Sequence, residues 1–177
     1  MPDLPLRYWD ACVMLSWVNG TQDRMMHIAP MLENSRNSKE YRIVTSALSM
    51  TEVAYGKEEQ DRGALDPATE EKINRLWAPG SPITVVEFYA LLAIEARTLM
   101  RRAISQGKAS LKPADAVHLA TADRLRVSHF DTYDRRLFNL SDITNTKFAI
   151  GPPSASAPHL PLGGPTTTSD PGAATKL

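Results

Sequence analysis

Short runs of apolar and β-branched residues alternate along this chain with longer segments that have the apolar spacing of a helix. The runs expected as strands are Leu6–Val13, which leads into a turn toward Met14–Val18, then Tyr41–Thr45, Ile83–Val86, Val127–Phe130 and Lys147–Ile150. Strands that alternate with helices favour a parallel sheet, because parallel strands need long crossover connections. We therefore expect an α/β fold with helices on both faces of a mainly parallel sheet.

The helix-like segments lie between these runs. They are Gln22–Ser35, Ser46–Gln60, a helix that starts at Asp66 and Pro67, Phe88–Ser105 and Pro113–Leu125. The start at Asp66 is the most specific of these features. An aspartate is a favoured N-cap, and a proline fits the first helical position because its missing N–H would have no partner there.

Length and composition predict one domain followed by a tail. The chain has 177 residues, of which 42% are hydrophobic, so residues 1–150 are enough to enclose a core. Residues 151–177 are rich in Pro, Gly, Ser, Thr and Ala and hold few large apolar side chains. Such a segment buries too little surface to offset its ordering entropy, and we expect it to be disordered.

Charge and cysteine content bear on how the chain could bind nucleic acid and on its cellular compartment. The formal net charge is zero, so the chain lacks the basic signature of a protein held on nucleic acid mainly by electrostatics. A nuclease remains compatible, because acidic catalytic residues would offset basic binding residues. The single cysteine, Cys12, and the lack of an apolar run of ~18 residues or a leader favour the cytoplasm, with no membrane span.

Four acidic residues fall at corresponding places in the expected fold. Asp10 and Asp134 follow expected strands, while Glu52 and Asp115 lie in helical segments that follow a strand or a loop. Sites in open parallel sheets lie outside the carboxyl ends of the strands, and a helix N-terminus favours a negative charge. These acids are therefore expected to converge on one edge of the sheet, although they are far apart in the sequence.

Four stretches, YWDACV, SMTEVAYG, LKPADAVHLATA and FDTYDRRL, occur in this order and resemble the PIN-domain family, in particular the VapC-type toxin ribonucleases of type II toxin–antitoxin systems. The resemblance covers about residues 6–150. It implies a three-layer α/β/α sandwich and a metal-dependent endoribonuclease acting on single-stranded RNA. It also implies a homodimer and a cognate antitoxin. The implied site residues are Asp10, Glu52, Asp115, Asp134 and Thr132, and Asp131 competes with Asp134 as the fourth acid.

The chemistry expected of these residues is phosphodiester hydrolysis. Carboxylate ligands suit Mg²⁺ or Mn²⁺, which polarises a phosphoryl oxygen and lowers the pKa of bound water. Asp10 and Asp115 are expected as metal ligands and Asp134 as a ligand or as the holder of a metal-bound water. Glu52 would orient or deprotonate the attacking water, and Thr132 would hydrogen-bond a neighbouring carboxylate. The expected contacts to RNA phosphate are Lys112, Arg135 and Arg136.

Simpler interpretations stay open for several of these residues. Asp115 could be only a helix N-terminal charge, Glu52 could be a surface residue paired with Lys57, and His118 is expected to be a packed or hydrogen-bonded helix residue. Asp123 is expected to lie away from the site and to tolerate a change to asparagine with little effect on cleavage. The whole domain could also be a non-catalytic PIN-like module that binds RNA or protein. A haloacid-dehalogenase-type phosphatase is disfavoured, because no D-x-D motif follows the first strand.

Overall fold

The computed structural model describes residues 4–37, 40–108 and 111–155. In chain order its elements are β1 Leu6–Trp9, α1 Ala11–Val18, α2 Gln22–Arg36, β2 Arg42–Ser46, α3 Ser49–Glu52, α4 Lys57–Arg62, α5 Pro67–Trp77, β3 Ile83–Val86, α6 Ala90–Ser105, α7 Pro113–Leu125, β4 His129–Asp131, the 3₁₀ helix η1 Arg135–Leu137, and β5 Ala149–Gly151. Most of the expected strands and helices are present within one or two residues of their expected bounds.

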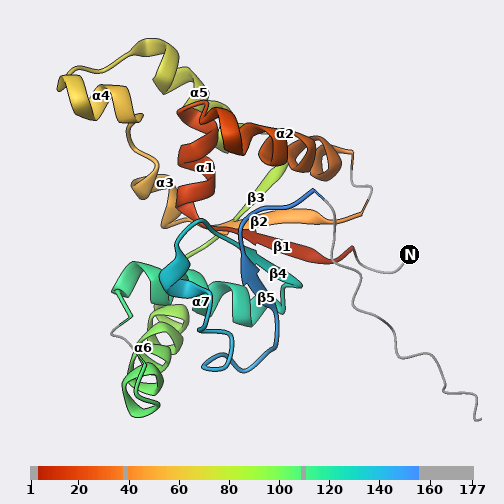
Figure 1. The fold of residues 1–177 in the computed structure, drawn as a ribbon, viewed down its shortest axis with the longest axis vertical. Helices are drawn as coiled ribbons and strands as arrows, with labels where there is room; N and C mark the ends of the chain where they lie inside the picture. The colour runs from red at the N-terminus through yellow and green to blue at the C-terminus, as the bar shows by residue number, and fades with distance from the viewer. Residues whose placement is uncertain (1–3, 38–39, 109–110, 156–177) are drawn as a thin grey trace, which may run out of the picture.

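The sheet has five parallel strands in the order β3-β2-β1-β4-β5. Helices α1, α2 and α5 cover one face and α6 and α7 cover the other, so the fold is the expected three-layer α/β/α sandwich (Figure 1). From β1 the chain passes to β2 on one side, and it later returns to β4 on the other side. The carboxyl ends of β1 and β4 therefore flank the switch point of the sheet, where ligands bind in open α/β folds.

The sheet separates two hydrophobic cores. Successive residues of a strand point to opposite faces, so Tyr8 packs beneath α6 and α7 while Trp9 packs beneath α1 and α2. Tyr8 stacks on Phe130 of the neighbouring strand with ring centroids 5.0 Å apart. Both Tyr8 and Trp9 are fully buried. Burial on both faces fixes the direction in which β1 carries its next residue, Asp10.

Two expected elements differ from the structure. The strand expected over Leu6–Val13 ends at Trp9, because a helix begins at Ala11 and buries Val13 and Met14 against the sheet. The helix expected over Ser46–Gln60 is divided into α3 and α4. Between them Val53 leaves the helical conformation and is fully buried in the core that contains Trp9. Tertiary packing has overridden the local helix pattern at this point.

The end of the domain lies slightly beyond residue 150. Gly151 pairs with Asp131 in the sheet, and Pro153 is buried. Residues 156–177 of the expected tail lie outside the described residues. Within the described ranges, no helix is long and apolar enough to cross a membrane.

Candidate active site

Asp10 and Thr132 connect the ends of the two strands at the switch point. The Thr132 hydroxyl donates a hydrogen bond to Asp10 Oδ2 at 2.7 Å, and the Cys12 thiol donates to the same oxygen at 3.2 Å. Asp10 occupies the N-cap position of α1, but its side chain makes no capping hydrogen bond. The carboxylate is thus oriented by its contacts with Thr132 and Cys12. Its second oxygen, Oδ1, lies 3.9 Å from His118 Nε2.

Glu52 and His118 join α3 to α7. Glu52 Oε2 lies 2.6 Å from His118 Nε2, while Tyr8 Oη lies 2.7 Å from His118 Nδ1. The Tyr8 hydroxyl also accepts a hydrogen bond from the Ser46 backbone N–H at 3.0 Å. Burial raises the pKa of Tyr8 well above its usual range, so this hydroxyl keeps its proton. The expectation that His118 is a hydrogen-bonded helix residue is confirmed.

The surroundings of Glu52 differ from its simpler interpretation as a surface residue paired with Lys57. Lys57 pairs with Asp61 at 2.6 Å, an ordinary exposed pair one helical turn apart. Glu52 is an exposed residue, as that interpretation expects, but its side chain is 32% exposed and its partner is the buried His118 rather than Lys57. Its carboxylate is therefore held at the edge of the sheet.

Asp115 lies in the first turn of α7 and is half-buried. Burial raises the pKa of its carboxyl, and the negative charge of Asp10 raises it further, whereas Arg136 and His118 oppose the shift. Asp134 also raises this pKa. Asp115 is thus within electrostatic reach of both aspartates that follow β1 and β4. We call Asp10, Glu52, Asp115 and Asp134 the acid rim.

Asp131 and Asp134 have different partners. Asp131 forms a buried two-point ion pair with Arg7, with Nε–Oδ2 2.9 Å and Nη2–Oδ1 2.5 Å. Burial raises the pKa of the Asp131 carboxyl, and the hydrogen bonds from Arg7 oppose this. Asp134 lies beyond the strand, and its backbone N–H donates to the Thr132 hydroxyl at 3.0 Å. Because Asp131 is committed to Arg7, Asp134 is the better candidate for the fourth site acid.

The three basic residues expected to contact RNA phosphate lie beside Asp134, but they are not equivalent. Arg136 donates to both Asp134 oxygens, and these hydrogen bonds lower the pKa of the Asp134 carboxyl. The charge of Lys112 lowers it further. All three side chains are exposed, and it is the pairing of Arg136 with Asp134 that sets it apart from Lys112 and Arg135.

The acid rim offers few unpaired carboxylates to a divalent cation. Among the described residues, no group of three or more His, Cys, Asp or Glu side chains is arranged to hold a metal ion. Asp134 is paired with Arg136 and Glu52 with His118, which leaves Asp10 and Asp115 as the candidate carboxylate ligands. Mg²⁺ is usually bound by one or two carboxylates, with waters and substrate phosphates completing its shell. Two carboxylates therefore fit a divalent cation whose remaining ligands come from water and substrate.

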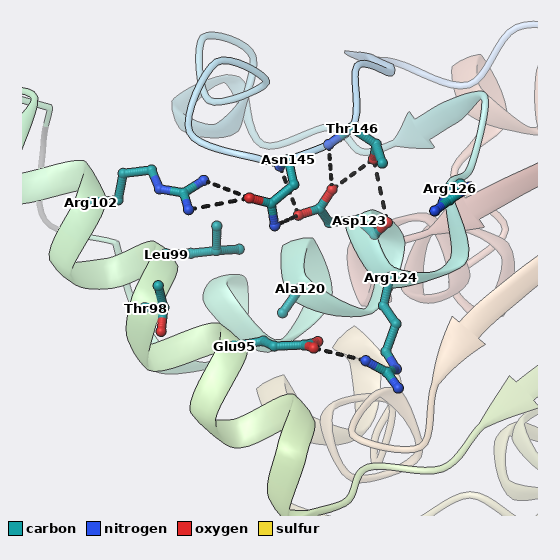
Figure 2. Close-up of a pocket in the computed structure, with 10 residues that line it drawn as sticks. All are labelled: Glu95, Thr98, Leu99, Arg102, Ala120, Asp123, Arg124, Arg126, Asn145 and Thr146. Carbon is teal, nitrogen blue, oxygen red and sulfur yellow. Dashed lines mark hydrogen bonds and ion pairs between the residues drawn. The ribbon is translucent and has the colours of Figure 1, made fainter.

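Asp123 marks the opposite end of α7, where it lines a pocket of about 300 Å³ between α6, α7 and residues 145–146 (Figure 2). It lies away from the acid rim, as expected. Its surroundings indicate a structural role. Asp123 is buried and accepts hydrogen bonds from the backbone N–H groups of Asn145 and Thr146 and from both of their side chains, at 2.7–2.8 Å. It fixes the segment that leads into β5.

Two residues that contact the site residues, Tyr8 and Cys12, could not be recognised from the sequence. Tyr8 reads as an ordinary strand residue, and Cys12 reads as a small buried apolar residue. Cys12 instead contacts Asp10 and Thr132, and it accepts a hydrogen bond from the Tyr133 backbone N–H.

The family assignment rests on a match over most of the chain. The PIN domain family profile matches residues 7–143, which include Asp10, Glu52, Asp115 and Asp134. The chain belongs to the PIN domain family. PIN domains are generally nucleases, so at this coarse level the chain is assigned to the hydrolases.

A solved structure shares this PIN fold. It is VapBC2 from Rickettsia felis bound to a DNA fragment from its promoter, with a TM-score of 0.58 and 12% sequence identity. The match covers 82% of this chain and 98% of that chain. No curated protein matches the sequence significantly. At this identity the likeness establishes the fold alone.

Proposed function

We propose that this PIN domain is a divalent-metal-dependent endoribonuclease that hydrolyses phosphodiester bonds of single-stranded RNA, and that it is the toxin of a toxin–antitoxin pair. The observation that carries the proposal is the acid rim. Its members come from four separate segments and gather at the carboxyl ends of β1 and β4, beside the switch point of the sheet. Carboxylates so arranged repel one another, and a cation among them removes that cost.

In the proposed mechanism, Asp10 and Asp115 would hold Mg²⁺ or Mn²⁺. When bound, the ion supplies Lewis-acid stabilisation of the phosphoryl group and lowers the pKa of a water. Thr132 and Cys12 fix one oxygen of Asp10, so the other oxygen is presented in a defined direction. Glu52 orients the attacking water and accepts its proton.

Asp134 and the basic residues complete the proposed site. Asp134 holds a water at the rim, and its pairing with Arg136 keeps a cation beside it. Lys112 and Arg135 contact RNA phosphates near the acids and offset the repulsion between substrate and site. They contribute to affinity for any sequence, so their loss is expected to weaken binding more than to change cleavage specificity.

The toxin proposal implies two protein partners and the cytoplasm as the compartment. The first partner is an antitoxin, which the likeness to VapBC2 supports, and we expect it to cover the acid rim. The second is another copy of this chain. The start of α6 and the residues before it carry exposed apolar side chains, namely Phe88, Tyr89, Leu91 and Ile94, with 41–60% of each accessible. A face of this kind is typical of an interface.

Light scattering of the purified chain tests the dimer, and co-purification with the product of an adjacent reading frame tests the antitoxin.

The decisive test uses Asp115→Asn and a mixed RNA pool with Mg²⁺. Asparagine keeps the shape of aspartate but removes the charge, so we expect cleavage to fall by roughly 100-fold or more, since even outer-shell changes at metal sites cost about 10–100-fold. The metal-free fold should be as stable as wild type or more so, because repulsion from Asp10 is removed. Urea midpoints in EDTA measure this.

Asp61→Asn is the matched control. Asp61 is exposed and pairs only with Lys57, so cleavage and stability should stay near wild type. Cleavage by Asp115→Asn at the wild-type rate would refute the proposed site. RNA binding by the wild type with no cleavage in Mg²⁺ or Mn²⁺ would favour the alternative, a non-catalytic PIN-like binding module.

A further inference from the structure

We propose that Tyr8 and His118 form a buried relay that positions Glu52, so that His118 is a positioning residue for the nuclease reaction. The inference rests on the proposed function and adds to it a part that the four acids do not provide. The relay consists of the Tyr8 hydroxyl 2.7 Å from His118 Nδ1 and His118 Nε2 2.6 Å from Glu52 Oε2. It links β1, α7 and α3.

The direction of each hydrogen bond follows from the donors available. The Ser46 backbone N–H donates to the Tyr8 oxygen at 3.0 Å, so this oxygen already acts as an acceptor. Thr45 also hydrogen-bonds the Tyr8 hydroxyl and lowers its pKa, as a donor to the Tyr8 oxygen does, so we assign the buried Tyr8 proton to His118 Nδ1, 2.7 Å away. A ring that accepts at Nδ1 carries its proton on Nε2. That proton points at Glu52.

Glu52 needs such a restraint because its own helix gives it little support. α3 has only four residues and ends at Glu52, and the next residue, Val53, leaves the helical conformation. A glutamate at the end of a single helical turn has several side-chain rotamers available. His118 is only 1% exposed and is held by the packing of α7, so its Nε2–H provides a fixed point for one carboxylate oxygen.

The same nitrogen of His118 lies close to both Glu52 and Asp10. His118 Nε2 lies 3.9 Å from Asp10 Oδ1, on the opposite side of Asp10 from the oxygen that Thr132 and Cys12 hold. This separation is longer than a hydrogen bond, so the ring nitrogen holds the proposed base and lies near a proposed metal ligand without holding it. His118 is too deeply buried to contact RNA, so its loss should reduce kcat and leave KM nearly unchanged.

Two conservative variants separate positioning from mere packing. In His118→Gln the side-chain amide can reach the former Nε2 position and donate to Glu52. In His118→Asn the amide reaches only the Nδ1 position, where it can bond Tyr8 but cannot reach Glu52. We expect kcat of His118→Asn to fall by about 10–100-fold with KM within about twofold of wild type, a typical loss for an outer-shell partner. His118→Gln should recover most of that loss.

His27, an exposed residue of α2, supplies the control variant His27→Asn, which should leave kcat and KM unchanged. Urea midpoints of every variant establish that the folded protein is being assayed. If the Asn and Gln variants are equally destabilised and have the same kcat once folded, His118 is only a packing residue and the proposal fails. Tyr8→Phe keeps the ring volume and gives an independent test, with a smaller fall in kcat expected.

The tautomer of His118 can be measured by NMR without an assay of RNA cleavage. Ring-nitrogen spectra of the metal-free full chain should show His118 protonated at Nε2 and not at Nδ1, and Tyr8→Phe should weaken that preference. A His118 ring protonated at Nδ1 alone overturns the relay, whether or not the protein cuts RNA. A wild type that shows the expected tautomer but cuts no RNA refutes the nuclease proposal, while the hydrogen-bond assignment stands.

Discussion

Asp115 and Asp123 lie on one helix and have opposite surroundings. Asp115 faces other carboxylates, and burial together with the charge of Asp10 raises its pKa. Asp123 faces hydrogen-bond donors from Asn145 and Thr146. The same side chain is thus electrostatically unfavourable at one end of α7 and stabilising at the other. Repulsion among carboxylates is typical of functional sites, whereas a carboxylate whose lone pairs are all satisfied is typical of a structural anchor.

We therefore predict that Asp123→Asn destabilises the protein. The substitution replaces one acceptor oxygen with an NH₂ group, which would face the N–H and hydroxyl donors of Asn145 and Thr146. Hydrogen bonds to a charged group contribute about 1.5–3 kcal/mol each, and we expect a loss of unfolding free energy in that range. Urea titration measures it. Asp142→Asn, at an exposed carboxylate whose main partner is Lys108, should cost much less.

At the scale of elements, α5 has the start that its sequence predicts. Asp66 is the N-cap, and its side chain accepts hydrogen bonds from the Ala68 and Thr69 backbone N–H groups at 3.3 and 3.2 Å. The Thr69 hydroxyl also donates to it at 2.9 Å, and this bond is the main reason that the pKa of Asp66 is lowered. The cap is local, so a short stretch of sequence was enough to identify it.

This cap leads to a prediction on pH dependence. Because the pKa of Asp66 is lower in the folded state, its contribution to stability is present above the unfolded value of about 3.9 and is lost as pH falls through the folded value. Asp66→Asn keeps a capping side chain but cannot titrate. Thermal melts from pH 5 to pH 2 should therefore show a smaller loss of Tm for Asp66→Asn than for wild type. Equal losses in both proteins would mean that the cap does not favour the ionised form.

At the scale of the whole molecule, the parallel sheet brings the acids together. β1 and β4 are neighbours in the sheet although more than a hundred residues separate them in sequence. α7 leads directly into β4, so the C-terminus of α7 lies near the start of that strand. Its N-terminus, with Asp115, therefore lies at the edge of the sheet where the strands end. A cation bound at this edge would connect segments from both halves of the chain.

We predict that Mg²⁺ or Mn²⁺ raises the Tm of the wild type. A cation that binds only the folded state stabilises it by about 2.7 kcal/mol at 100 times its dissociation constant. Asp10→Asn should show a much smaller shift, because it removes one proposed ligand. Asp61→Asn should behave like wild type. The same shift in Asp10→Asn and wild type would place the bound metal elsewhere on the molecule.

The tail supplies a last prediction, made from composition. Deletion of residues 156–177 should leave the urea midpoint and RNA cleavage within error of wild type, because this segment holds few large apolar residues. The deletion stops short of Pro153, which is buried and belongs to the domain. A clearly lower midpoint, or lost cleavage, would mean that the segment docks on the domain.

The sequence by itself determined the kinds of elements, their order and the positions of the acids relative to the strand ends. These features depend on local patterns. Ile83–Val86 and Pro113–Leu125 have the bounds that their patterns predict, because apolar periodicity and a first-turn proline act within a few residues. The family likeness was also legible, because the acids occur in order at suitable spacing.

Only the tertiary structure decided which partner each polar side chain takes. In the sequence only the T-x-D spacing favours Asp134 over Asp131, and it is Arg7, on a strand far away in sequence but adjacent in the sheet, that commits Asp131. Similarly, Tyr8 and Glu52 find His118 only because α7 packs across the sheet. The break after α3 has the same origin, since burying Val53 outweighs continuing the helix. Hydrogen bonds and burial between distant segments depend on the whole fold, and no local pattern encodes them.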